Sequence, residues 1–209
     1  MAPQRRKTVA QRNVRTAGFL GRPELKYYDT ADTSATAVAT AGIIRNDSLV
    51  DGITQGSGPS GRLGNRILVK KVLFNYSGHI TSTATPGDAC DILRFMIVQD
   101  KQCNGSAATV GEVLESANMN SFNDLETSSR FKILYNKFHV MNTFGAYSTQ
   151  NSRSYIHFQG AIDCNIPVQF SASTGAVGDV STNNIFVLAI SENGEAIIDG
   201  QLRVRYLDR

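Results

Sequence analysis

Hydrophobic and polar residues alternate along most of this chain with the period of two that is typical of half-buried β-strands. In residues 67–81 one face carries Val72, Phe74, Tyr76 and Ile80, and the other carries Leu73, Asn75, Ser77, His79 and Thr81. Runs of this kind, separated by Gly, Asn, Asp, Ser and Pro clusters, predict eight strands, at residues 43–54, 67–81, 92–99, 131–140, 155–161, 165–170, 185–190 and 197–206. A similar run at residues 25–29 is not included in these eight. Residues 185–190 are apolar on both faces, which predicts a strand covered on both sides.

One segment has helical spacing instead. Thr109 and Glu112 form a capping-box pattern, in which a Thr before the first turn is followed three residues later by Glu. Val110, Val113, Leu114 and Ala117 then repeat at the spacing of one helix face. A short helix over residues 110–117 is therefore expected, within the long connection between the strands at 92–99 and 131–140.

These elements predict an all-β chain: an eight-stranded antiparallel jelly-roll sandwich with a short helix in one inter-strand loop and a basic N-terminal arm. The jelly roll is the eight-stranded form of a two-sheet antiparallel sandwich. A barrel or an immunoglobulin-like sandwich satisfies the same pattern of strands. The length of 209 residues is that of a single domain.

The charge is divided unevenly along the chain. Residues 1–22 hold six basic residues and no acidic ones, whereas all 18 Asp and Glu residues follow. The expected organisation is a basic arm at 1–22 and a slightly acidic body at 23–209. Such an arm binds polyanions, because each Lys or Arg near a phosphate releases condensed counterions. The alternatives are a solubilising tail or a nuclear-import signal around Arg5, Arg6 and Lys7.

No catalytic or metal-binding constellation emerges from the sequence. Residues 56–61 match the G-x-G-x-x-G string of dinucleotide-binding proteins, but Pro59 interrupts it and a strand follows instead of a helix. The three His and three Cys residues are scattered, so no metal site, cofactor or disulfide framework is expected. The carboxylate pairs Asp88 with Asp91 and Glu112 with Glu115 are expected on the solvated surface. Neither a membrane span nor a secretory signal is expected.

Five segments, in order along the chain, carry a resemblance to a known family. They are Glu24–Thr30, Gln55-Gly56 with Arg62–Ile67, Asp100–Gly105 with Thr109–Leu114, Arg130–Leu134, and Arg203–Asp208. Together they resemble the single-jelly-roll capsid proteins of small circular single-stranded DNA viruses that encode a replication initiator. Coat proteins of satellite necrosis viruses of plants are similar in the region of residues 100–134. Leu63 stands where Ile is commoner in the family, which is a mild departure.

The resemblance implies a capsid protein that assembles with about 60 copies of itself into a small icosahedral virion. Its other partner is a single-stranded viral genome, DNA being favoured over RNA; no enzyme activity or membrane is implied, and assembly in the host nucleus is compatible with it. The sequence names no host receptor. The expected nucleic-acid-binding residues are those of the arm: Arg5, Arg6, Lys7, Arg12, Arg15 and Arg22. Secondary candidates are Arg62, Arg66, Lys70 and Lys71, near the start of the strand at 67–81.

Two alternatives from other classes remain at this point. A cellular protein that binds single-stranded nucleic acid would need exposed aromatic side chains on a sheet, for which Tyr76, Tyr135 and Tyr155 are candidates. A hydrolytic or lectin-like jelly-roll protein would need a His cluster or an acid pair, and the sequence offers neither in a recognisable spacing. The coat protein of an RNA satellite virus is the variant of the capsid hypothesis that differs only in its genome.

Overall fold

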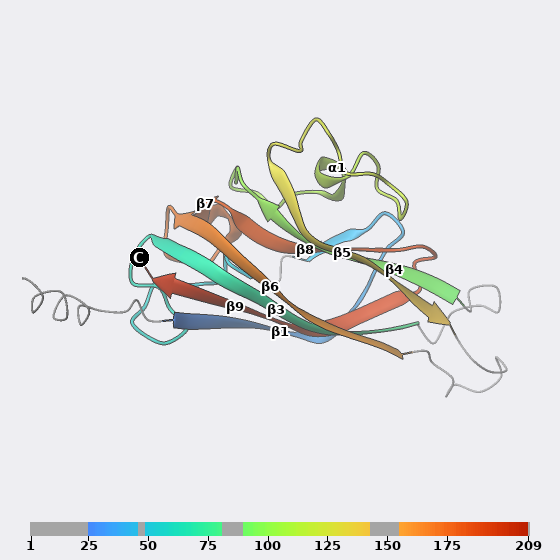
Figure 1. The fold of residues 1–209 in the computed structure, drawn as a ribbon, viewed down its shortest axis with the longest axis horizontal. Coiled ribbons are helices and arrows are strands. Elements are labelled where there is room, and N and C mark those ends of the chain that lie inside the picture. Colours follow the sequence, from blue (N-terminus) through green and yellow to red (C-terminus); the bar gives the residue numbers. More distant parts are fainter. Residues whose placement is uncertain (1–24, 46–48, 81–89, 143–154, 209) are drawn as a thin grey trace, which may run out of the picture.

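The computed structural model describes residues 25–45, 49–80, 90–142 and 155–208. Within these ranges the chain forms two antiparallel β-sheets packed face to face, with very little helix (Figure 1). The expected all-β antiparallel sandwich is therefore confirmed. The basic arm at residues 1–22 lies outside the described residues.

The larger sheet has five strands in the order β1-β9-β3-β6-β7. They are β1 (Leu25–Ala37), β9 (Ala196–Asp208), β3 (Arg66–Ile80), β6 (Tyr155–Phe170) and β7 (Val180–Thr182). The smaller sheet has four strands in the order β2-β8-β4-β5. They are β2 (Ile43–Arg45), β8 (Asn184–Ser191), β4 (Cys90–Asp100) and β5 (Phe131–Asn142).

The described strands number nine, and three of the sequence expectations need correction. The run at 25–29 begins a full strand, β1, which pairs with β9. The runs at 155–161 and 165–170 are one continuous strand, β6, because Asp163 and Asn165 fall at alternate positions and face solvent. The predicted strand at 43–54 is much shorter, since Asp51 and Gly52 form a turn after β2.

The core lies between the two sheets. Its aromatic centre contains Phe74 and Tyr76 from β3, Phe95 from β4 and Phe158 from β6. The ring centroids of Tyr76 and Phe95 are 4.9 Å apart, and those of Phe95 and Phe158 are 5.0 Å apart. Gly160 makes room for this cluster, because a Cβ there would lie 2.4 Å from the ring of Phe74. The alternation predicted for β3 is thus confirmed by its buried inner face.

The smaller sheet is covered on its outer face as well. The helix α1 spans only Val110–Val113, shorter than expected, and lies in the connection between β4 and β5 above this sheet (Figure 1). A second apolar cluster fills the space beneath it, with Val113 and Leu114 packed among Met96, Val98 and Leu188. Seven of the eight residues of β8 are therefore buried, and the expectation of a strand covered on both sides is confirmed.

A buried carboxylate fixes the turn between β8 and β9. Asp91, which was expected on the surface, is fully buried at the start of β4. Its oxygens accept hydrogen bonds from the Ser191 hydroxyl and from the backbone N–H groups of Glu192, Asn193 and Glu195. A carboxylate in a dry environment needs such donors, and the turn provides them. Asp88, its partner in the sequence pattern, lies outside the described residues.

Candidate assembly and nucleic-acid interface

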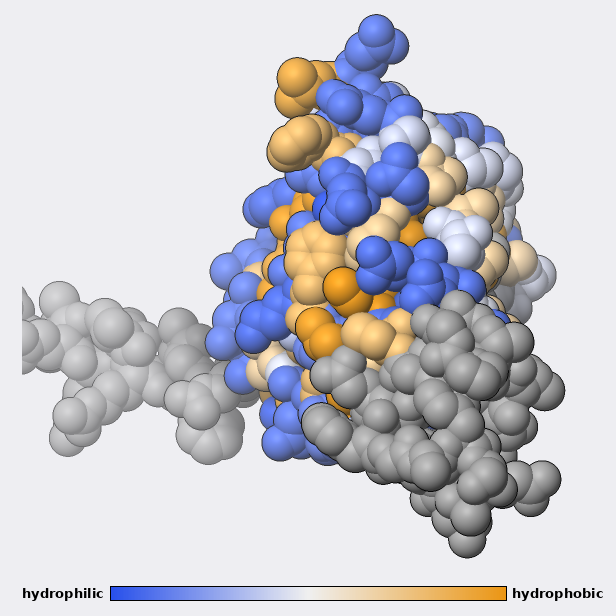
Figure 2. Space-filling view, turned by 90° about the vertical axis from the view of Figure 1, so that its right-hand side faces the viewer, coloured by the Kyte–Doolittle hydropathy of each residue, from blue (hydrophilic) through white to orange (hydrophobic). Residues whose placement is uncertain are grey.

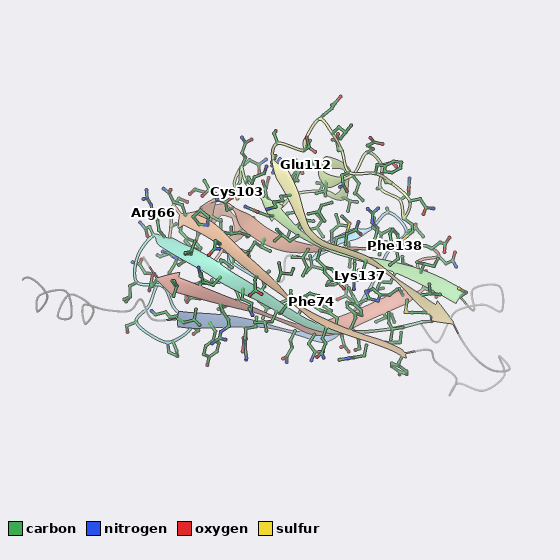
Figure 3. All side chains as sticks on the ribbon, in the orientation of Figure 1. Arg66, Phe74, Cys103, Glu112, Lys137 and Phe138 are labelled. Atoms are coloured by element: carbon green, nitrogen blue, oxygen red, sulfur yellow. The ribbon has the colours of Figure 1, made fainter. Side chains whose placement is uncertain are left out.

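The six arm residues predicted to bind nucleic acid, Arg5, Arg6, Lys7, Arg12, Arg15 and Arg22, lie outside the described residues. The four secondary candidates are described. They lie near one end of the larger sheet, where Arg66 begins β3 (Figure 3). Their surroundings differ sharply.

Arg62 is a structural residue and offers no surface to a phosphate. It is fully buried, and its guanidinium donates hydrogen bonds to the carbonyl oxygens of Ile53, Gly64 and Ala172. The same group lies 4.0 Å above the ring of Phe170. Burial lowers its pKa, and nearby carboxylates counteract this in part. Arg62 therefore ties loops together, and we no longer count it among the phosphate-binding candidates.

The other three secondary candidates remain accessible. Arg66 is exposed at the first position of β3. Lys70 is half-buried and donates a hydrogen bond to the side-chain oxygen of Asn165. Lys71 forms an ion pair with Asp163, with 2.9 Å between the charged atoms. Exposed pairs of this kind are weak and exchange readily with another anion.

Two of the family-like segments, at opposite ends of the described chain, are held together by ion pairs. Antiparallel pairing of β1 with β9 places Asp29 opposite Arg203, and two hydrogen bonds of 2.5 and 2.6 Å join them. The Nζ of Lys26, almost fully buried, lies 3.1 Å from a carboxylate oxygen of Asp208. The same oxygen accepts a hydrogen bond from the backbone N–H of Leu63, in a third such segment. The positions of the charged residues in these segments therefore match the ion pairs that form between β1 and β9.

Three further family-like positions meet in one ion cluster, which we call the Arg130 cluster: Asp100, Glu112 and Arg130. The guanidinium of Arg130 contacts both oxygens of Asp100, at 3.0 and 2.9 Å, and one oxygen of Glu112 at 2.9 Å. Burial raises the pKa of Glu112, but hydrogen bonds from Thr109 and Arg130 outweigh burial and lower it overall. The cluster joins the end of β4 to α1 and to the start of β5.

We expect Arg130→Ala to lower the free energy of unfolding by about 3 kcal/mol, because the Asp100 carboxylate is only 4% exposed and would lose its counter-charge. Urea denaturation of the subunit at neutral pH measures this. The exposed Arg66→Ala is the matched control and should change stability by less than about 0.5 kcal/mol. The difference between wild type and Arg130→Ala should shrink as pH falls through the lowered pKa of Glu112. A loss for Arg130→Ala no larger than the control would contradict the role of the cluster.

Four exposed apolar side chains lie on the α1–β5 connection and on β5. Phe122 and Leu125 are each 78% exposed, and Phe138 and Val140, on the outer side of β5, are 52% and 55% exposed. Buried Arg94 links the two parts, since its guanidinium donates to the carbonyl of Ser121 and lies 5.3 Å from the ring of Phe138. Figure 2 shows apolar patches near the top and across the middle of this end of the molecule, with hydrophilic residues between them. We call these four residues the apolar stripe.

The tyrosines named as stacking candidates do not form a platform. Tyr76 is buried in the core and Tyr135 is half-buried with its ring 4.7 Å from that of Phe74, while Tyr155 is exposed. His79, His139 and His157 do not converge, and no group of three His, Cys, Asp or Glu that could hold a metal occurs among the described residues. The three cysteines are free thiols. Among the described residues no helix is long and apolar enough to cross a membrane.

Residues 56–61 form a loop before β3, as the sequence indicates. The backbone N–H of Gly56 donates to the carbonyl of Arg62, and a Cβ on Gly61 would lie 2.8 Å from the carbonyl oxygen of Gly56. Gly61 is therefore required by a close approach of two backbone segments. The next element is the strand β3, so this loop lacks the helix that pyrophosphate binding needs.

One family model matches nearly the full chain. The family described as satellite tobacco necrosis virus coat protein matches residues 4–209. Comparison with curated proteins gives no match. One solved structure, described as "Crystal structure of the T13 IBDV viral particle reveals a missing link in icosahedral viruses evolution", aligns with 88% of this chain and 31% of its own chain, at 9% identity. Its TM-score of 0.26 is too low to support an argument about fold or function.

Proposed function

Because this chain belongs to the satellite tobacco necrosis virus coat protein family, we propose that it forms a closed icosahedral shell of about 60 copies around single-stranded nucleic acid. The chain is a viral capsid protein, a self-assembling structural component of the virion. The observation that carries the proposal is the family match, which includes most of the basic arm as well as the entire sandwich.

The order of the strands supports a jelly roll as the wall of this shell. When the three-residue β7 is set aside, eight strands remain, in two sheets of four. The sheets have the orders β1-β9-β3-β6 and β2-β8-β4-β5, so the chain crosses repeatedly between them. Two interleaved Greek keys produce this arrangement, and capsid domains commonly use it. The proposed division is therefore an arm at residues 1–22 and a jelly-roll capsid domain at 23–209.

The arm is the proposed genome-binding element. Its six positive charges, with no acid among them, suit phosphate contacts that do not depend on base sequence. The family-like turn at Asp100–Gly105 and the ending at Arg203–Asp208 favour a DNA genome. The satellite-virus alternative, with an RNA genome, fits the family match. Nuclease sensitivity of the packaged material distinguishes the two.

The test of the whole proposal is assembly. The chain should be expressed alone and examined by electron microscopy and light scattering at moderate salt. Uniform small spheres that contain nuclease-protected nucleic acid are the expected result. A protein that stays monomeric across pH and salt, even with single-stranded DNA or RNA added, would overturn it. The same result would favour a cellular single-strand-binding protein, which a sizing column would show as a monomer or dimer.

A further inference from the structure

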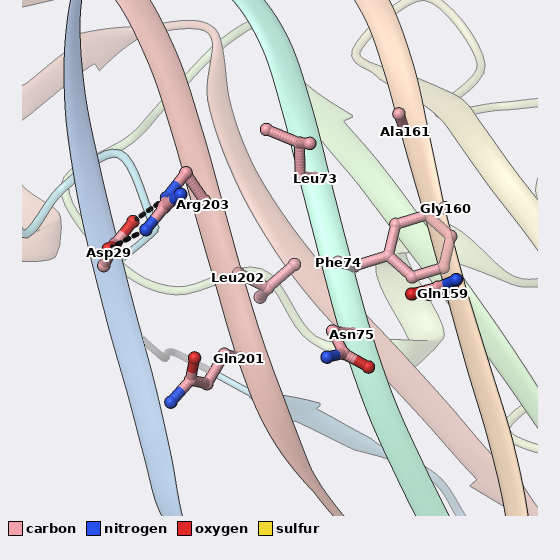
Figure 4. Close-up of a pocket in the computed structure, with 10 residues that line it drawn as sticks. All are labelled: Asp29, Leu73, Phe74, Asn75, Gln159, Gly160, Ala161, Gln201, Leu202 and Arg203. Carbon is pink, nitrogen blue, oxygen red and sulfur yellow. Dashed lines mark hydrogen bonds and ion pairs between the residues drawn. The ribbon is translucent and has the colours of Figure 1, made fainter.

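The outer face of the five-stranded sheet carries a hollow. It lies over β1, β9, β3 and β6, and its lining includes Asp29, Leu73, Ala161 and Arg203 (Figure 4). The covering of the two sheets differs. The α1–β5 connection lies over the outer face of the smaller sheet (Figure 1), whereas Asp29, Leu73, Ala161 and Arg203 on the larger sheet are at least partly exposed. The larger sheet therefore has the broader uncovered face.

Strand register arranges the exposed side chains of this face in rows that cross the strands. One row is formed by Gln201, Asn75 and Gln159, which are cross-strand neighbours on β9, β3 and β6 and are all exposed. We call these three residues the amide row. Each amide carries both donors and an acceptor, as the edges of nucleobases do. The next row toward the start of β3 contains Leu73 and Ala161, which form an apolar floor.

Three cations of the larger sheet have no carboxylate partner among the described residues: Arg66, Lys70 and Arg205. Of these, Arg205 lies nearest in register to Leu73 and Arg203, which line the hollow. Arg203 is held by Asp29, and Lys71 is paired with Asp163. Asp199 accepts a hydrogen bond from the hydroxyl of Ser77. Arg205, which lies between Tyr27 on β1 and Lys71 on β3, is exposed and has no ion pair among the described residues. It is thus the group on this face best placed to take a phosphate.

We propose that this face binds the packaged single strand, with a phosphate at Arg205 and bases over the apolar floor and against the amide row. The inference rests on the proposed function and adds a second contact to that of the arm. Arg205 and Gln201 are four positions apart along β9, a distance of about 14 Å, which is enough for more than one nucleotide. Tyr27 is 44% exposed beside Arg205 and offers a ring for stacking.

Continuity of the chain favours a nucleic acid as the occupant. The basic arm runs directly into β1, an edge strand of this same sheet. A single-stranded nucleic acid bound by the arm is therefore held near this face at high effective concentration. Arg203 and Lys71 on this face are already paired with carboxylates. The face should therefore contribute to nucleic-acid binding through individual contacts and not through a large net positive charge.

The test is binding of short labelled homopolymer oligonucleotides, of DNA and of RNA, to the full-length subunit at several salt concentrations. Arg205→Ala should weaken binding and reduce the log–log salt slope by about 0.7, the value for one phosphate on a single strand. Asn75→Ala, Gln159→Ala and Gln201→Ala should each weaken binding about threefold with the slope unchanged, as expected for the loss of one neutral hydrogen bond. The matched controls are Lys137→Ala and Gln102→Ala, both exposed and away from this face.

The outcomes separate this inference from the proposed function. If Arg205→Ala and the amide variants bind as the two controls do, while the wild type binds strongly, the face is not a binding site and the arm alone carries the strand. If the wild type binds no oligonucleotide at all, the genome-packaging proposal itself fails. Thermal melting of each variant should match the wild type, because all four side chains are exposed.

Discussion

Deletion of residues 1–22 should abolish or sharply reduce nucleic-acid packaging while leaving the body folded. All six basic residues of the arm are removed, and no core strand is lost, since β1 begins at Leu25. Six phosphate contacts on a single strand correspond to a log–log salt slope of about −4, and this contribution should be lost from the binding of the truncated subunit, which keeps only the slope of about −0.7 expected for Arg205. The measurements are the ratio of absorbance at the nucleic-acid and protein maxima in purified particles, and salt-dependent binding of oligonucleotides.

A scrambled arm that keeps the same six charges is the control, and it should package normally because phosphate contacts do not read sequence. Empty shells and unassembled subunits are both compatible with the proposed role of the arm. Normal amounts of nucleic acid in particles of the truncated protein would contradict it. Melting of the truncated subunit by circular dichroism should show a cooperative transition like that of the full chain.

Replacing one residue of the apolar stripe by Glu should prevent particle formation. Leu125 and Phe138 are exposed in the isolated subunit. In a coat protein that assembles, we expect another copy of the subunit to cover these apolar side chains. Burial of such a side chain contributes about 1.5–3 kcal/mol, and a closed shell repeats the contact in every subunit. A buried Glu would lose this contribution and add the cost of desolvating a charge. The expected result for Leu125→Glu and Phe138→Glu is a folded, soluble subunit without spheres in electron microscopy.

Two controls make this result specific. Phe138→Leu keeps an apolar side chain and should still assemble. Gln102→Glu adds the same charge at an exposed position outside both the stripe and the amide row, and should leave particle yield unchanged. If Leu125→Glu assembles as well as the wild type, the stripe is not a contact between subunits. Sedimentation velocity of each subunit before assembly would show whether the substitution acts on folding or on association.

The sequence predicted the two-sheet architecture more accurately than it predicted where each strand begins and ends. Alternation identified β3, β4, β5, β8 and β9 because one or both faces of these strands are buried, and burial is what hydrophobic periodicity records. It divided β6 at Asp163 and Asn165, since outward-facing polar residues look like a turn when the partner strand is unknown. It extended β2 too far because Leu49, Val50 and Ile53 are buried in a turn rather than in a sheet.

Charged residues were the least predictable part of the site. Arg62 and Asp91 look like surface residues in the sequence, yet both are fully buried: Arg62 donates a hydrogen bond to the carbonyl of Ala172, and Asp91 accepts one from the backbone N–H of Glu195. Only tertiary structure brings those partners together, so no local pattern reveals them. Capping-box chemistry did identify Glu112, and the family-like segments contained Asp100 and Arg130. What those segments did not reveal is that the three residues meet in one cluster.

The pairing of β1 with β9 has a consequence for the order of events during synthesis. Lys26 and Asp208, which this pairing joins, are 182 positions apart in the chain. Contacts of such long sequence separation form late, because loop closure must precede them. On the ribosome β1 has no partner for its β9-facing edge until β9 has emerged. The arm and β1 are thus made long before the larger sheet can close, which delays formation of the capsid wall until β9 is available.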